Sequence, residues 1–203
     1  MKDNDKILIE SAMELRNWLQ ENHEKKESVW LVKWKKDSGN PYLSYDEIVD
    51  ELMCFGWVDS LPKKLDEQKS MLRISPRNPK SNWSRVNKNR ITRLLETGRI
   101  APSGMELINL AKANGAWNFL DDVENLILPE DLKKALSSID KAAYYFNRFP
   151  KSSKRGILEW IKNAKQDKTR HKRIMETAQK AAHNRKANFP KGRDAGPKEE
   201  VKD

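Results

Sequence analysis

The chain has 203 residues, enough for one or two domains with a substantial core, and 34% of them are charged. Its formal net charge of +10 favours an acidic partner such as nucleic acid, an anionic membrane surface or a phosphorylated ligand, although a basic balance also serves solubility alone. No run approaches the ~20 apolar residues that cross a bilayer, and the acid-containing N-terminal stretch does not resemble a signal peptide. We therefore expect a cytoplasmic location.

The sequence predicts neither a disulfide, a metal site nor a cofactor. Cys54 is the only cysteine, and it lies in an apolar helical pattern typical of a small core residue rather than a nucleophile. Glu47 and Glu51 have the i, i+4 spacing of a metal-binding pair, but without a further ligand nearby they favour a solvated helix face. The three histidines are scattered: His23, His171 and His183.

The first half of the chain predicts a small sheet covered by two helices. Capping-box spacing predicts helices over Ile9–Asn22, with Ser11 as N-cap, and from Ser44 to about Phe55. β-Branched and aromatic residues predict strands over Ser28–Lys36, Trp57–Leu61 and Ser70–Ser75. The last two suit a hairpin joined by a long basic linker, Pro62–Lys69. In the first strand, Trp30, Val32 and Trp34 form the fully apolar face, which we expect to meet the core.

The second half predicts helices only. They cover Asn82–Thr97 with Ser81 as N-cap, Met105–Ala113, Glu130–Ser137, Asp140–Phe149, Lys154–Lys165 with Ser152 or Ser153 as N-cap, and Arg170 to about His183 beginning at Thr169. Ile100–Gly104 is expected to be a turn, followed by a helix with Leu107, Leu110 and Ala111 facing inward. From Asn184 onward there is almost nothing to bury, which predicts a disordered tail.

These elements predict an α+β fold: a small antiparallel sheet of about three strands with helices, followed by an all-helical C-terminal half. The expected division is an α+β portion over residues 1–104, a helical portion over 105–183 packed on it, and a tail over 184–203. The positive charge is concentrated in two segments that do not coincide with these portions. Residues 63–93 hold ten basic and two acidic groups, net +8, and residues 150–203 hold sixteen and seven, net +9, so the remainder is net −7.

Residues 71–93, the basic stretch, predict a localised anion site. The stretch has seven lysines or arginines and no acid, and two prolines, Pro76 and Pro79, hold its first part extended ahead of a helix N-terminus, which itself favours anions. The predicted site residues are Arg73, Arg77, Lys80, Ser81, Trp83, Ser84 and Asn87. Arg77 suits a bidentate contact and Lys80 a point charge. Trp83 either stacks on a base or ring of the ligand, or fills the gap between sheet and helix.

Asp59 and the basic helix near the C-terminus each have two possible roles. Asp59 faces the basic stretch in this scheme, where it either orients Arg77 or acts as an acid/base; we favour the orienting role. The basic helix near the C-terminus either contacts nucleic-acid phosphates or is a solvated face beside acidic parts of the chain. The candidate phosphate contacts there are Lys165, Arg170, Lys172 and Arg173.

Several motifs resemble the YdeI/OmpD-associated family of bacterial and archaeal proteins. They are Phe55–Ser60, Ile74–Arg77, Lys80–Ser84 with Asn87, Gly98 with Pro102–Gly104, Gly115–Trp117, and a late block from Trp160 to Ile174. Together they span about residues 25–180. The family name refers to bacteriocin protection, so the resemblance implies a role in stress or antimicrobial-peptide resistance. The chain has Ser75 where the family pattern leads us to expect a threonine, and both supply a hydroxyl.

The function predicted from sequence is therefore binding rather than catalysis. The partner is an anionic ligand, either nucleic acid or a phosphorylated metabolite, held by the basic stretch. The alternative is an enzyme for a small phosphorylated or carboxylated substrate, with Asp59 as acid/base and Arg77 and Lys80 as the anion clamp. A pocket holding both Asp59 and Arg77 would favour the enzyme.

Overall fold

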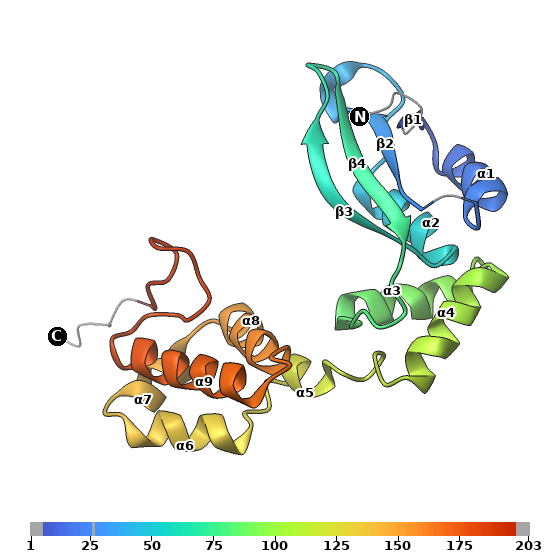
Figure 1. The fold of residues 1–203 in the computed structure, drawn as a ribbon. Helices are drawn as coiled ribbons and strands as arrows, with labels where there is room; N and C mark the ends of the chain where they lie inside the picture. The colour runs from blue at the N-terminus through green and yellow to red at the C-terminus, as the bar shows by residue number, and fades with distance from the viewer. Residues whose placement is uncertain (1–5, 26, 198–203) are drawn as a thin grey trace. The chain divides into compact units, whose positions relative to one another are not determined.

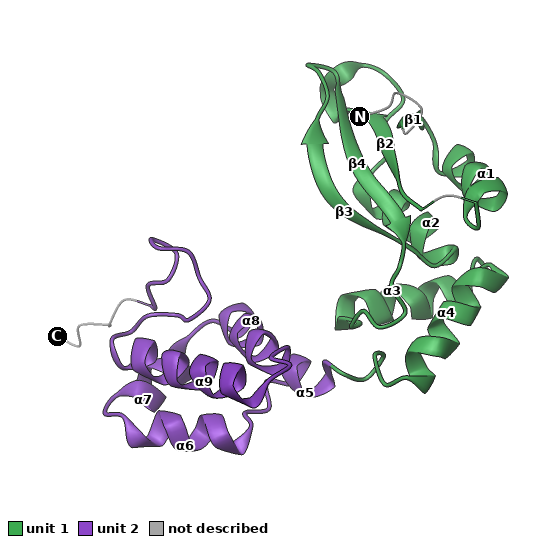
Figure 2. Cartoon of the chain, in the orientation of Figure 1, with its two compact units in different colours: residues 1–119 green, residues 120–203 purple. Residues whose placement is uncertain are grey.

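The computed structural model describes residues 6–25 and 27–197 (Figure 1). The chain folds into two compact units, residues 1–119 and 120–203 (Figure 2). The first combines a sheet with helices and the second is helical, which confirms the predicted α+β class. The division lies after residue 119, later than the expected division after residue 104.

The sheet has four strands in the order β1-β2-β4-β3, one more than predicted. They are β1 (Lys6–Leu8), β2 (Val29–Trp34), β3 (Trp57–Lys64) and β4 (Lys69–Pro76). β1 pairs parallel to β2, and the other pairs are antiparallel. Three residues are too short to show an alternating pattern, which is why β1 escaped prediction.

The β3–β4 hairpin is confirmed, but its loop is shorter than the predicted Pro62–Lys69 linker. Both strands extend into that linker, and the turn is held by Asp66, whose Oδ1 accepts hydrogen bonds from the backbone N–H groups of Gln68 and Lys69 at 2.8 and 2.7 Å. The pairing of β3 with β4 shifts between Asp59 and Pro62, so β3 carries a bulge there.

The described part of the N-terminal unit also has four α-helices, α1 (Ala12–Asn22), α2 (Tyr45–Cys54), α3 (Arg85–Glu96) and α4 (Pro102–Ala113), and a 3-10 turn, η2, at Lys36–Ser38. Ser11 and Ser44 are N-caps as predicted, and Ser44 forms a complete capping box with Glu47. The prediction of Ser81 as the N-cap of α3 is wrong. The cap is Ser84, which accepts from the backbone N–H of Asn87, because the chain stays extended through Asn82 and Trp83.

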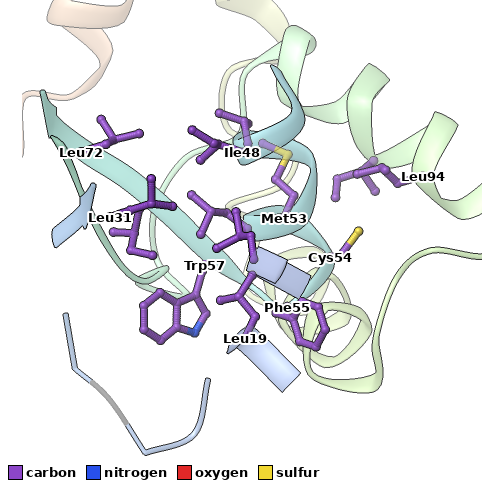
Figure 3. Packing of buried hydrophobic residues seen from close by; sticks show 14 of the residues in the cluster. Leu19, Leu31, Ile48, Met53, Cys54, Phe55, Trp57, Leu72 and Leu94 are labelled. Atoms are coloured by element: carbon purple, nitrogen blue, oxygen red, sulfur yellow. The ribbon is translucent and has the colours of Figure 1, made fainter. Parts of the chain in front are cut away.

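The core of this unit lies between the sheet and its helices (Figure 3). Val29 and Leu31 of β2 belong to it, so the prediction that Trp30, Val32 and Trp34 face the core is wrong. Trp30 and Val32 instead form a small cluster with Met71. Lys33 misled the prediction: it shares the core face with Leu31 but lies further along the strand, where its ammonium group reaches the carbonyl of Leu43 at 2.7 Å.

Helix α4 packs on the end of α2 at backbone distance. A Cβ added at Gly104 would lie 2.2 Å from the carbonyl oxygen of Cys54, so only glycine fits. The expected turn over Ile100–Gly104 is wrong in its second half, because Pro102 opens the helix. Leu110, predicted to face inward, is 45% exposed, and Ile108 is buried in its place.

The C-terminal unit consists of α5 (Asp121–Glu124), α6 (Glu130–Ser138), α7 (Ala142–Arg148), α8 (Lys151–Lys162) and α9 (Asp167–Ala182). The predicted caps at Ser152 or Ser153 and the predicted start at Thr169 are wrong. Pro150 and Gln166 occupy the N-cap positions, and neither caps through its side chain. None of the described helices is long and apolar enough to span a membrane.

The predicted disorder from Asn184 onward is wrong for residues 184–197. Arg185 bridges Ala195, and the backbone N–H of Lys186 donates to the carbonyl of Asp194 at 2.5 Å. Ala187 and Asp194 are buried. The polar composition of the segment concealed this anchoring. Residues 198–203 of the predicted tail lie outside the described residues.

Candidate functional site

The Arg77 loop, residues 77–84, connects β4 to α3. Strand β4 ends at Pro76, and the next backbone N–H, that of Arg77, donates to the carbonyl of Gly56 at 2.9 Å. Gly56 has a φ of 74°, a conformation that glycine adopts without strain. The Phe55–Gly56–Trp57 turn therefore fixes the start of the loop.

Arg77 is buried with no carboxylate partner among the described residues. It is only 8% exposed, its Nη2 donates to the carbonyl of Asn82 at 2.6 Å, and its Cζ lies 4.1 Å from the ring centroid of Trp83. Its Nε has no hydrogen-bond partner within the described residues. Burial lowers the pKa of Arg77, and no acid of the described residues offsets this effect. The loop thus holds a cation whose charge is not neutralised by the part of the chain that the structure describes.

Four other arginines of the same unit contact carboxylates. Asp50 contacts Arg90, Arg93 and Arg99 at 2.5, 2.7 and 3.7 Å. Glu51 contacts Arg16 at 2.9 Å and Arg99 at 2.5 Å. We call these six residues the ionic cluster. Because Arg90 and Arg93 belong to the basic stretch, part of its positive charge is consumed inside the fold.

The ionic cluster was missed by the sequence reasoning, which placed Glu51 on a solvated face with Glu47. Glu51 is 3% exposed, whereas Glu47 is exposed and caps its own helix. The signal was present as two adjacent acids, Asp50 and Glu51, at positions flanked on both sides by apolar residues. Acids in such a position need partners: Arg90 and Arg93, three apart on α3, supply them for Asp50, and Arg16 and Arg99 supply them for Glu51.

Trp83 is buried inside the unit. It is 2% exposed, and its ring centroid lies 5.1 Å from that of Trp117 at an interplanar angle of 44°. The predicted stacking of Trp83 on a ligand base is therefore wrong, and Trp83 is instead a core residue of the unit. Lys88 and Lys112 place their ammonium groups 5.5 and 5.4 Å from the ring centroid of Trp117. Positive groups thus surround this aromatic pair.

The remaining predicted site residues separate into two groups. Lys80 is exposed in the same loop as Arg77, and Ser81 is half-buried there. By contrast, Ser84 and Asn87 form the cap of α3, and Arg73, on β4, donates from Nη2 to the hydroxyl of Ser28 at 3.0 Å. The loop itself therefore brings together Arg77, Lys80 and Ser81 of the predicted set.

Asp59 does not orient Arg77, so that prediction is wrong. Its Oδ2 accepts from the hydroxyl of Tyr45 at 3.0 Å. Burial, followed by the charge of Asp59, raises the pKa of Tyr45. Asp59 lines a pocket of about 790 Å³, and neither Arg77 nor Lys80 is among the described residues that line it. The three residues of the predicted enzyme site, Asp59, Arg77 and Lys80, therefore do not line one pocket there.

The basic groups predicted near the C-terminus are partly engaged. Arg170 makes a bidentate contact with Asp131, at 2.8 and 3.0 Å. Arg173 donates to the carbonyl of Trp160 and its Cζ lies 5.0 Å from the Trp160 ring centroid. Lys165 and Lys172 are exposed. Two of the four candidates therefore have structural roles.

No metal site is evident in the described residues, where no three His, Cys, Asp or Glu side chains come together. Cys54 is fully buried, as predicted for a core residue, and burial raises its pKa. A protonated, inaccessible thiol is not suited to act as a nucleophile.

Two protein families match this chain over different ranges. Residues 7–107 match a domain of unknown function, DUF8412, and residues 125–184 match the family described as bacteriocin-protection, YdeI or OmpD-associated. No curated protein and no solved structure matches. Of the motifs that suggested the family, the Trp160–Ile174 block lies within the second range, whereas those from Phe55 to Gly104 lie within the first. The match to the YdeI/OmpD-associated family thus covers residues 125–184, within the helical unit.

Proposed function

We propose that the N-terminal unit binds a phosphate-bearing anion at the Arg77 loop, with nucleic acid as the first candidate ligand. One observation carries the proposal: Arg77 is buried without a carboxylate among the described residues, while Arg90, Arg93 and Arg99 each have one. Leaving a buried ion without a counterion costs several kcal/mol, as a general estimate of about 3–5 kcal/mol for a broken buried pair indicates. A bound anion would offset that cost.

Arg77 retains hydrogen-bonding capacity for such a ligand. Its Nη2 is used by Asn82 and its Nε is buried, but Nη1 makes no described hydrogen bond and is not among the buried unpartnered atoms. Arginine nitrogens bind phosphate oxygens with charge-assisted hydrogen bonds. Exposed Lys80, three residues along the same loop, adds a mobile second charge.

Nucleic acid is favoured because further positive groups lie near the loop and in the second unit. Lys88 and Lys112 flank Trp117, which packs against Trp83. Lys165 and Lys172 are exposed in the helical unit. Phosphate contacts from separate lysines suit a polyanion better than a single phosphate, and they make binding depend steeply on salt.

The test is fluorescence polarisation of a labelled single-stranded oligonucleotide with the full chain at several salt concentrations, beside thermal-shift assays with inorganic phosphate and ATP. We expect Lys80→Ala to weaken binding severalfold while the melting temperature without ligand stays unchanged, because Lys80 is exposed. Arg77→Lys keeps the positive charge but loses the planar guanidinium group that can donate two parallel hydrogen bonds to a phosphate. This variant should therefore weaken binding more than Lys80→Ala does.

Lys36→Ala is the matched control, since Lys36 is an exposed lysine of the same unit outside the loop. Stabilisation by phosphate or ATP with no oligonucleotide binding would identify a small ligand as the partner. Equal effects of Lys80→Ala and Lys36→Ala on every ligand, or no binding at low salt, would refute the site.

The wider role follows from the family description. We propose that the chain acts in the cytoplasm and contributes to protection against bacteriocins, the function that the description of the matched family names. Survival of a deletion strain under bacteriocin challenge, with and without the restored gene, tests the role, and cell fractionation tests the location. Complementation by the Lys80→Ala variant as well as by the natural chain would separate the role from the Arg77 loop.

A further inference from the structure

A second concave surface lies on the N-terminal unit, away from the Arg77 loop. Its volume of about 790 Å³ falls in the range of about 300–1,000 Å³ that is usual for small-molecule sites. Leu72, which lines it, also belongs to the core between sheet and helices, and Tyr45, the first residue of α2, lines it as well. The pocket therefore lies on the helix-covered side of the sheet, beside the start of α2.

The strand register places polar and apolar residues in separate rows on the floor of this pocket. Ser70 pairs with Lys33 of β2 on one side and with Lys64 of β3 on the other. In the same way, Leu72 pairs with Pro62. Because residues two apart on a strand share a face, a row of lysine, serine and lysine lies beside an apolar row. This arrangement matches an amphipathic molecule with an anionic end.

Lys33 is the half-buried cation of the first row. Its Nζ donates to the carbonyl of Leu43 at 2.7 Å and lies 4.7 Å from the ring centroid of Tyr42, and it makes no described ion pair. Burial lowers the pKa of Lys33, although the charge of Glu47 acts in the opposite direction. Both close partners of this ammonium group are neutral, so an anion entering the pocket gains a charge-assisted contact.

The other end of the pocket offers a hydrogen-bond acceptor. Asp59 uses Oδ2 to accept from Tyr45, at 3.0 Å, and its Oδ1 accepts no hydrogen bond from the described residues. A carboxylate accepts only, so it recognises a hydroxyl or an ammonium group. The pocket thus has an apolar row, an acceptor, and a row of two lysines, of which Lys64 also contacts the exposed Glu67.

We propose that this pocket binds a small organic anion that also carries a hydroxyl or amino group. Its carboxylate or phosphate lies on the row formed by Lys33, Ser70 and Lys64. Its carbon skeleton rests on Leu72 and Pro62, and its hydroxyl or amino group donates to Asp59. The site is separate from the Arg77 loop and does not depend on the function proposed for that loop.

The first experiment is an NMR titration of the isotope-labelled full chain with three probes: 4-hydroxyphenylacetate, phenylacetate and glycerol 3-phosphate. Amide shifts are expected at Ser70 and Leu72 with all three. The hydroxyl should make 4-hydroxyphenylacetate bind about tenfold more tightly than phenylacetate, the usual effect of one hydrogen bond to a charged group. The comparison of phosphate with carboxylate identifies the preferred anion.

Single substitutions test which residues bind the anionic group of the probe and which bind its hydroxyl group. Lys33→Met and Lys64→Ala should each weaken all three probes about tenfold, whereas Asp59→Ala should remove the preference for 4-hydroxyphenylacetate and leave phenylacetate binding intact. Lys64 is exposed, so its variant remains informative if Lys33→Met fails to fold. Lys36→Ala and Lys80→Ala, both outside the pocket, should change nothing.

The proposal is overturned if none of the probes shifts a pocket amide at about 10 mM, a concentration that detects millimolar dissociation constants. It is also overturned if Lys64→Ala and Lys36→Ala behave alike, or if Asp59→Ala weakens both phenylacetates equally. Loss of oligonucleotide binding in Lys80→Ala with pocket binding intact would show that the two sites are independent.

Discussion

At the scale of single residues, the arginines of the N-terminal unit differ in whether a carboxylate contacts them. Those of the ionic cluster contact Asp50 or Glu51, and Arg77 contacts a backbone carbonyl and the ring of Trp83. All belong to the same residue type, and the surrounding carboxylates decide their roles. Sequence composition cannot separate them, because the partner acids lie about 40 positions away in the chain.

The first prediction concerns Asp50. Asp50→Asn removes the charge that faces Arg90, Arg93 and Arg99, and so increases the excess of positive charge in a partly buried cluster. We expect the free energy of unfolding to fall by about 3 kcal/mol, as for other buried pairs that lose one partner. Urea denaturation measures it. Asp46→Asn, which removes an exposed partner of Arg90, is the control and should cost less than about 1 kcal/mol. Equal losses would mean that the cluster is not a buried network.

The second prediction concerns the thiol of Cys54. Burial, and then the charge of Glu51, raises its pKa above the ordinary value of 9.0. In the unfolded chain the thiol ionises near that value, whereas in the folded chain it stays protonated to higher pH. Its contribution to stability is therefore fully present below pH 9.0 and is lost as the pH rises above it.

Urea denaturation between pH 7 and 10 should therefore show a steeper alkaline loss of stability for the natural chain than for Cys54→Ala. A thiol reagent should label Cys54 only as fast as the chain opens. Rapid labelling of the native chain would contradict the burial of this residue.

At the scale of elements, sequence predicts the type of most helices and strands and misplaces several of their ends. Ser44 and Glu47 predict the start of α2 correctly, because both halves of the capping box are local. The start of α3 fails because Ser81 and Ser84 are equally good caps in sequence, and the decision comes from Trp83. Its burial in the core holds the chain extended up to Ser84.

The third prediction tests that corrected start. Ser84→Ala removes the side-chain acceptor for the backbone N–H of Asn87 and should lower stability by about 1 kcal/mol. Ser81→Ala should change stability by less than about 0.5 kcal/mol, as is usual for substitutions outside such features. Thermal unfolding of both variants makes the comparison. A larger loss in Ser81→Ala would restore the original placement of the cap.

The same limit applies to the candidate site. The sequence placed Arg77 and Lys80 correctly in one loop, because Pro76 and Pro79 are local signals. It could not show that Trp83 lies against Arg77 on one side and Trp117 on the other, since that packing joins distant segments. Nor could it show the pocket at Asp59, which depends on the register of β3 with β4.

At the scale of the whole molecule, the chain is two compact units with different family matches. Each unit has its own buried residues, and the C-terminal one includes the segment after α9 that composition alone predicted to be disordered. In that segment, Ala187 is buried and Phe189 lies over Gly156 of α8. A few apolar residues in a polar segment are enough to anchor it, because neighbouring helices complete the packing.

The fourth prediction concerns this segment. A chain ending at His183 loses the burial of Ala187 and the partial burial of Phe189, which should lower the stability of the helical unit by about 2 kcal/mol, the contribution of roughly one large apolar side chain. Circular dichroism at increasing temperature should show an earlier loss of helix. A chain ending at Pro197, which keeps every described residue after α9, is the control. Identical melting of the two shortened chains would mean that the segment contributes no stability.

The bulge in β3 has a consequence for how copies of this protein behave at high concentration. β3 is the outer strand at one side of the sheet, and an outer strand offers backbone groups to which another sheet can add. The register shift between Asp59 and Pro62 interrupts that row, Pro62 lacks a backbone N–H, and Lys63 and Lys64 follow directly. At the opposite side, β1 has only three residues. The sheet is thereby protected on both sides against edge-to-edge aggregation, although one of its faces carries tryptophans.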